Sequence, residues 1–409
     1  MSVLHIYEGF GIELEYMIVD RDTLKAKPIS DEILKVVTGA YNSDYDNGNI
    51  SWSNELVLHV IEIKTNGPRN KLCGLENDFL ININEITEIL KNFNAKLLPT
   101  GAHPLFIPRD ETKLWPHENN PVYDAYNRIF NCDGHGWSNL QSTHINLPFA
   151  NDDEFYRLHT AIRCVLPIIP ALTASTPLIE GKNTGIIDTR LDFYKNNQKK
   201  ILSLAGDVIP ELITSKGEYQ NKIFSRIFAD IEKYDTDDIL KNEWLNSRGA
   251  IARFDRNAIE IRIIDLQESP IADVSLAALI IEVIHLISED PQMLASAATL
   301  SQKELVSILN STIKYGEQVV ITNEDYLSLF EMKSEIKAGE LWAILLENIG
   351  QNPIFMSEAQ LKTAKEIIKR GTLSSRIITA IKNDYSMQNI KSVYQRLSAC
   401  LLNNEIFHP

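Results

Sequence analysis

The chain has 409 residues, of which 44% are hydrophobic and 23% charged, a balance typical of folded globular proteins. Its net charge of −15 repels nucleic acid and anionic membrane surfaces, so we expect neither as a partner. We find no apolar run of the ~18 residues that a membrane span needs and no signal-like N-terminal segment, and therefore expect a cytoplasmic protein. The four cysteines lie far apart, which favours reduced, structural thiols.

Residues 10–20 place two acids in an otherwise apolar strand. Because side chains alternate along a strand, Glu13 and Glu15 share one face, while Ile12 and Leu14 share the other. Two buried carboxylates side by side are unfavourable unless a cation compensates them, and Mg²⁺ prefers oxygen ligands. The pair therefore predicts metal ligands, although an edge strand with a solvated polar face would show the same pattern.

The next acids follow a stretch rich in turn-forming residues, 41–54, which we expect to be a loop. Residues 55–65 then read as a buried strand with Glu55 and Glu62 at its two ends. A spacing of seven puts these two on opposite faces of a regular strand. If both serve one site, Glu55 must lie at a bend or bulge before the strand proper.

Three further elements frame this region. Apolar residues spaced by three or four predict an amphipathic helix over 70–94, and 96–103 resembles a strand. Residues 104–126, rich in Pro, Asn and aromatic side chains, predict a long ordered loop bordering a site.

A fourth strand, predicted over 141–149, carries His144 and Asn146 on one face. A single histidine on a strand is most often structural, but nearby carboxylates make His144 a candidate metal ligand. Residues 152–174 predict a helix divided by its prolines, followed by a loop of small residues over 175–185. No Walker loop or Gly-x-Gly-x-x-Gly helix start occurs, so a nucleotide would need another binding device.

A last strand, predicted over 258–265, places Glu260 and Arg262 on one face. The two could simply pair across the sheet. In a functional interpretation Glu260 binds metal and Arg262 binds phosphate, with Arg248 and Arg253 adding positive charge where a polyphosphate needs it.

The remaining sequence is helical. The apolar helix predicted over 273–288 should be buried, and 291–409 contains amphipathic helical segments without strands. We therefore divide the chain into a catalytic core, 1–290, and a helical C-terminal region, 291–409, packed on it.

These motifs, in this order, resemble the glutamate–cysteine ligase family, type 2, over roughly residues 10–290. The resemblance lies in Gly-Ile-Glu-Leu-Glu at 11–15, Thr-His-Ile-Asn at 143–146, and residues 248–265. It implies an α+β fold like that of glutamine synthetase, with acids lining a curved antiparallel sheet and helices on its outer face. It also implies metal ligands at Glu13, Glu15, Glu55, Glu62, His144 and Glu260, phosphoryl contact by Arg262, and substrate binding near Thr184, Gly185 and Arg190.

The same resemblance implies two or three Mg²⁺ ions, with Mn²⁺ as a substitute, ATP as co-substrate, and an amino-acid carboxylate and an amine as partners. It is also compatible with a homo-oligomer. Chemistry agrees, because a carboxylate reacts with an amine only after activation, and phosphoryl transfer depends on positioning and charge neutralisation. The expected function is an ADP-forming carboxylate–amine ligase, with glutamate–cysteine ligase as the specific form that the family name suggests. The alternatives are a phosphotransferase of the guanidino-kinase type and a non-catalytic nucleotide- or metal-binding relative.

Overall fold

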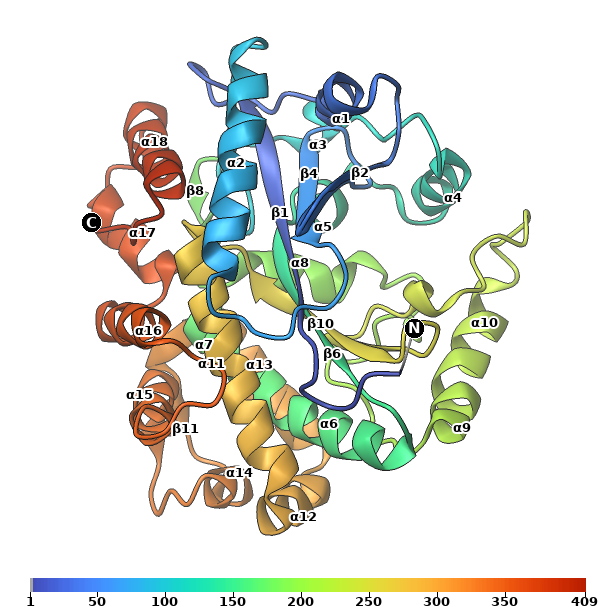
Figure 1. The fold of residues 1–409 in the computed structure, drawn as a ribbon, viewed down its shortest axis with the longest axis vertical. Helices are drawn as coiled ribbons and strands as arrows, with labels where there is room; N and C mark the ends of the chain where they lie inside the picture. The colour runs from blue at the N-terminus through green and yellow to red at the C-terminus, as the bar shows by residue number, and fades with distance from the viewer. Residues whose placement is uncertain (1–2) are drawn as a thin grey trace.

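A computed structural model describes residues 3–409 and shows a mixed α/β fold built on one eight-stranded antiparallel sheet (Figure 1). The strand order is β2-β3-β4-β1-β6-β10-β9, and β5 also pairs with β1. The predicted α+β class with an antiparallel sheet is confirmed. The strands of this sheet are β1 Gly11–Asp20, β2 Asp44–Asn47, β3 Ile50–Asn54, β4 Val60–Thr65, β5 Ala95–Leu98, β6 Ser142–Pro148, β9 Ala250–Arg253 and β10 Ala258–Asp265.

The two faces of the sheet differ as the alternation on β1 predicts. Ile12 and Leu14 are fully buried in the apolar core, on the face that α2 (Leu75–Lys91) helps to cover. Glu13 and Glu15 point to the other face. The remaining helices of the first 270 residues are α1 Ser30–Thr38, α3 Pro108–Glu111, α4 Asn120–Phe130, α5 His135–Ser138, α6 Asp152–Val165, α7 Pro170–Thr173, α8 Thr189–Asn197, α9 Lys216–Tyr219 and α10 Ser225–Ile231.

Helix α11 (Pro270–Glu289) is the central helix of the core, as its apolar sequence predicts. Contrary to the sequence analysis, this helix is long and apolar enough by length and composition to cross a membrane, but 83% of its most apolar window is buried inside the protein. It packs against α2 and α6 on one side and against α16 on the other. The C-terminal helices are golden to red in Figure 1, with α15 to α18 along the left side and α12 and α14 at the bottom. Their bounds are α12 Pro291–Thr299, α13 Gln302–Tyr315, α14 Glu324–Leu329, α15 Ala338–Ile349, α16 Glu358–Arg370, α17 Leu373–Ile381 and α18 Met387–Asn403.

Two predicted loops are wrong. Residues 41–54 contain the hairpin β2–β3, in which Asn47 pairs with Ile50 around a two-residue turn. The turn-forming residues mark this turn, where Gly48 has a φ of +73°, rather than a long loop. Residues 104–126 contain the short helix α3 and the start of α4, each with a proline in its first turn, where proline is compatible with a helix.

Other boundaries differ by small amounts. The strand predicted over 96–103 is β5, which ends at Leu98. The helix predicted over 152–174 is divided into α6, a 3₁₀ turn and α7, as its prolines predict, and its N-cap is Asn151. Two short hairpins complete the strands, β7 Leu178–Ile179 with β8 Lys182–Asn183 and β11 Val320–Ile321 with β12 Ile336–Lys337.

Candidate active site

The sheet register brings the predicted acids together. Glu13 on β1 lies opposite His144 on β6, and Glu15 lies opposite Glu62 on β4. Glu260 on β10 lies opposite Asn146, the second polar residue of β6. Directly opposed residues in an antiparallel sheet project to the same face, so four strands contribute to one polar cluster.

The first group of this cluster is centred on His144. Its Nδ1 lies 3.0 Å from Glu13 Oε2 and 4.0 Å from Glu260 Oε1. Asn146 Nδ2 donates to Glu13 Oε1 at 2.9 Å. We call Glu13, His144, Asn146 and Glu260 the histidine group.

Charge in the histidine group is balanced internally. Burial opposes protonation of His144, but the hydrogen bond with Glu13 and the charges of Glu15, Glu13 and Glu260 raise its pKa to about 9. Burial also opposes ionisation of Glu13, but the hydrogen bond with His144 holds the Glu13 pKa below its ordinary value. A protonated imidazole therefore compensates the acids around it.

The second group consists of Glu15, Glu55 and Glu62, which we call the acid triad. Glu55 lies in the connection between β3 and β4, before the strand proper, so the predicted bend is confirmed. The Ser142 backbone N–H donates to Glu15 Oε2 at 2.7 Å, and Lys64 Nζ donates to Glu62 Oε2. These contacts leave the triad with a local excess of negative charge.

Burial and this excess of negative charge raise the pKa values of two members of the acid triad, Glu15 and Glu55. Burial and the charges of Glu15 and Glu62 raise the pKa of Glu55 well above its ordinary value. Burial also raises the pKa of Glu15, and Glu62 adds to the effect. A cation at this position would lower both pKa values.

The donor set fits divalent cations. One carboxylate oxygen from each member of the acid triad can be chosen so that all lie within 4.8 Å of one another. The same spacing holds for ligand atoms of Glu13, Glu62 and His144. Oxygen-rich sets of this kind, with one imidazole, suit Mg²⁺ or Mn²⁺.

Two of the predicted arginines lie beside Glu260. Arg262 Nε is 3.0 Å from Glu260 Oε1 without the alignment of a hydrogen bond, and Arg253 Nη1 is 3.6 Å from Glu260 Oε2. Arg253 also donates to Asp255 Oδ2 at 2.9 Å. Burial opposes ionisation of Glu260, but Arg262 first, and then His144 and Arg253, hold its pKa below the ordinary value.

The structure does not bring Arg248 to this cluster. Its guanidinium donates two hydrogen bonds of 2.7 Å to the Glu211 carboxylate and further bonds to Ser203 O and Asn246 Oδ1. A guanidinium bonded in this way stabilises the chain around residues 203–211. These contacts hold Arg248 in a structural role, and the prediction that it binds phosphate stays a prediction.

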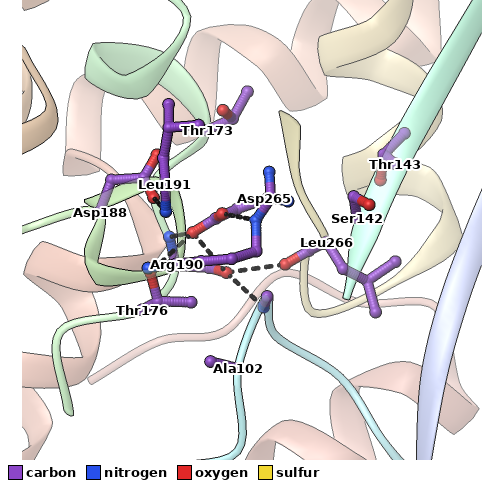
Figure 2. Close-up of polar contacts among 12 residues, drawn as sticks. Ala102, Ser142, Thr143, Thr173, Thr176, Asp188, Arg190, Leu191, Asp265 and Leu266 are labelled. Atoms are coloured by element: carbon purple, nitrogen blue, oxygen red, sulfur yellow. Dashed lines mark hydrogen bonds and ion pairs between the residues drawn. The ribbon is translucent and has the colours of Figure 1, made fainter. Parts of the chain in front are cut away.

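Arg190 is held beside the cluster by a buried polar network (Figure 2). Its Nε donates to Asp265 Oδ1 at 2.5 Å, and Asp265 Oδ2 accepts from the Ser175 N–H at 2.8 Å and from Thr176 Oγ1 at 3.0 Å. Arg190 Nη2 has no hydrogen-bond partner among residues 3–409. The network fixes the guanidinium at the end of β10, where it also lines the cavity described below.

Thr184 and Gly185 are placed elsewhere. Thr184 Oγ1 is 2.7 Å from Thr189 Oγ1, and the Gly185 N–H donates to Asn183 Oδ1 at 2.9 Å. Both residues stabilise their own turn, in which Gly185 has a φ of +73°, and neither lines the cavity. Their contacts are those of turn formation, and the substrate role predicted for them stays a prediction.

A cavity of about 470 Å³ opens next to the acid triad. Its charged lining comes from Glu15, Glu55, His144, Arg190 and Arg262. Its other walls come from α4, α5, α8 and the 3₁₀ turn η3 Glu243–Leu245. The sequence predicted that residues 104–126 border a site and that Arg190 lies in it, but it missed the walls from α5 and η3 and the other lining residues of α8. One signal was present, since residues spaced by four and three along α8 line the cavity: Arg190, Tyr194 and Asn197.

The site is thus one face of an antiparallel sheet that carries acids, a histidine and an arginine. The family described as Glutamate-cysteine ligase family 2 (GCS2) matches residues 9–395. The chain therefore belongs to this family, as the sequence motifs predicted.

Individual proteins are also similar to this chain in sequence or in fold. A protein of Archaeoglobus fulgidus described as "Uncharacterized protein" is 34% identical over 397 residues, covering 97% of this chain and 99% of its own. A protein of Cupriavidus metallidurans described as "Putative glutamate--cysteine ligase 2" is 26% identical over 189 residues, which is 45% of this chain and 46% of that protein. The crystal structure of glutamate–cysteine ligase from Francisella tularensis in complex with AMP has a similar fold, with a TM-score of 0.61, 13% identity, and coverage of 98% of this chain and 90% of that one.

Proposed function

We propose that this protein is an ATP-dependent, ADP-forming carboxylate–amine ligase that joins the carboxylate of a small amino acid to an amine through an acyl phosphate. The observation that carries the proposal is the convergence of Glu13, Glu15, Glu62, His144 and Glu260 from four strands on one face, with Arg262 beside Glu260. Family membership supports the reaction class. The AMP bound to the Francisella ligase supports a nucleotide site in this fold.

In this proposal the histidine group and the acid triad hold Mg²⁺ or Mn²⁺, which would neutralise charge on the nucleotide phosphates. Arg262, which lines the cavity, would donate to oxygens of the terminal phosphoryl group as it transfers. The 3.0 Å ion pair with Glu260 orients its fork. Arg253, on the far side of Glu260, adds positive charge towards the rest of the polyphosphate.

The chemistry then follows in two displacements. A carboxylate oxygen of the donor attacks the terminal phosphorus of ATP, and the bond to ADP breaks. The amine nitrogen next attacks the acyl carbon, the bond to phosphate breaks, and the nitrogen loses a proton. Glu15 and Glu62 are less than 8% exposed, so the proposed site limits access of water to the acyl phosphate.

An ADP-release screen with amino acids in pairs tests the proposal, starting with glutamate as the carboxylate donor and cysteine among the amines. We expect ADP and phosphate only when a donor and an amine are both present with Mg²⁺, and neither from Glu260→Gln. ADP formation that needs no amine would indicate the phosphotransferase alternative. ATP binding without any turnover across the screen would indicate the non-catalytic alternative.

A further inference from the structure

The cavity lies at one end of the polar cluster. Arg262 and Glu15 line it, whereas Glu13, Glu260 and Arg253 lie outside its lining. Strand β10 ends at Asp265, and Arg262 is closer to this end than Glu260 is. Asp265 pairs with Ser142, which also lines the cavity. The cavity therefore extends from the Arg262 end of the cluster, away from the side where Arg253 and Glu260 would meet the polyphosphate.

Much of the cavity wall is aromatic. Tyr123 and Tyr126 come from α4, Trp137 from α5 and Trp244 from η3, and we call these four residues the aromatic wall. Tyr126 makes an edge contact with Trp137, with ring centroids 5.3 Å apart, and lies 6.0 Å from Trp244. Contacts of this kind fix ring orientations and create a rigid apolar surface.

Polar atoms around this surface are left without partners. Trp137 Nε1, Asn197 Oδ1 and Gln198 Oε1 are buried and form no hydrogen bond within residues 3–409, and all three side chains line the cavity. A buried donor or acceptor without a partner is costly, so such atoms are usually satisfied by a ligand or ordered water. An apolar surface with a few polar groups at its edge is typical of a small-molecule site.

We infer that the aromatic wall binds the amine substrate and that this amine carries an aromatic or other bulky apolar group. This inference rests on the proposed ligase function and deepens it. The carboxylate donor must lie next to Arg262, where its phosphoryl group arrives, and the cavity continues from there to the aromatic wall. An amine bound on the wall would have its nitrogen directed towards Glu55, at the boundary between wall and acid triad.

Calorimetric titration tests the inference, using the full chain with Mg²⁺ and a non-hydrolysable ATP analogue. Phenethylamine should bind at least ~10-fold more tightly than ethylamine, because it adds a buried ring to the same amine. Trp244→Ala should weaken phenethylamine binding at least ~10-fold, and Trp244→Phe should restore most of it. Trp137→Ala provides an independent second wall variant. Tyr315→Ala, which removes an exposed aromatic outside the cavity, should change nothing.

Equal binding of phenethylamine and ethylamine would overturn the inference. So would a Trp244→Ala variant that weakens the ATP analogue but not phenethylamine, since the wall would then hold the nucleobase. Turnover separates this inference from the proposed function. Phenethylamine binding that depends on Trp244, without ADP release for any donor and amine, would support the amine site and contradict the ligase chemistry.

Discussion

The histidine group and the acid triad sit on the same face of one sheet but differ in how their charge is balanced. In the histidine group, His144 takes up a proton and lies within 4.0 Å of Glu13 and Glu260. In the acid triad, Lys64 contacts Glu62, while burial and neighbouring acids raise the pKa values of Glu15 and Glu55. The comparison indicates that an added cation would relieve repulsion in the acid triad, whereas His144 already compensates the acids of the histidine group.

The largest expected effect is on turnover and concerns Arg262, which faces both the cluster and the cavity. Arg262→Lys keeps the charge but replaces a planar fork with one ammonium, which cannot contact two phosphoryl oxygens in the same way. We expect turnover to fall at least ~10²-fold with a smaller change in ATP affinity, the pattern of an interaction made mainly in the transition state. Steady-state kinetics with ATP varied would measure both.

Arg256→Lys is the matched control, because Arg256 lies on the turn between β9 and β10 and its side chain is 59% exposed. It should leave turnover unchanged. Near-normal turnover in Arg262→Lys would instead identify Glu260 and Arg262 as an ordinary ion pair within the sheet.

The second prediction concerns the sign of two similar substitutions. Without metal, Glu13→Gln should destabilise the protein by roughly 1–3 kcal/mol, because it removes the charged partner of His144. Glu55→Gln should leave stability unchanged or raise it by up to about 1 kcal/mol, because it removes repulsion with Glu15 and Glu62. Thermal melting without metal, and again with Mg²⁺ and ATP, measures these changes.

With Mg²⁺ and ATP present, both variants should lose most of the ligand-induced rise in melting temperature. The exposed acid Glu347 provides the control, since Glu347→Gln should keep it. Equal destabilisation by both substitutions would show that the two groups do not differ in charge balance.

The third prediction is a pH dependence of the metal-free protein. The pKa of His144 is about 9 in the folded protein and near 6.5 unfolded, so its proton stabilises the fold fully below pH 6.5. This stabilisation, on the order of 3 kcal/mol, should be lost between pH 6.5 and 9. Urea unfolding across this range should show the loss in the native chain. His144→Asn should reduce the loss without abolishing it, because burial raises the pKa of Asp273 to about 8 and this group titrates in the same range. An unchanged slope in that variant would contradict a protonated His144.

Metal binding provides a second test of the protonation of His144. A metal ligand must be neutral imidazole, so Mg²⁺ or Mn²⁺ binding through His144 should release a proton and strengthen as pH rises towards 9. Calorimetry in buffers of different ionisation enthalpy would detect the proton. Metal binding without proton release would show that His144 is not a ligand and that the acid triad alone binds the metal.

The sequence predicted the polar face well because strand alternation is a local property. The Glu-x-Glu of β1, the His-x-Asn of β6 and the Glu-x-Arg of β10 each required only that a strand form. The spacing of Glu55 and Glu62 even predicted a bend, since no regular strand could bring both to one site.

What the sequence did not predict depends on partners far along the chain. In the sequence, Arg248 has the same positive charge as Arg262. Only the fold shows that the Arg248 guanidinium is hydrogen-bonded to Glu211, which lies 37 residues away. The aromatic wall joins segments more than 100 residues apart, from Tyr123 to Trp244. Periodicity within a segment carries no information about such contacts.

The central claim is that the polar face activates a carboxylate by phosphoryl transfer, and trapping the intermediate tests this most directly. Hydroxylamine should replace the amine and form a hydroxamate in a one-to-one ratio with ADP when the correct carboxylate, ATP and Mg²⁺ are present. Glu260→Gln should form neither product. Stoichiometric AMP and pyrophosphate in place of ADP would contradict the account.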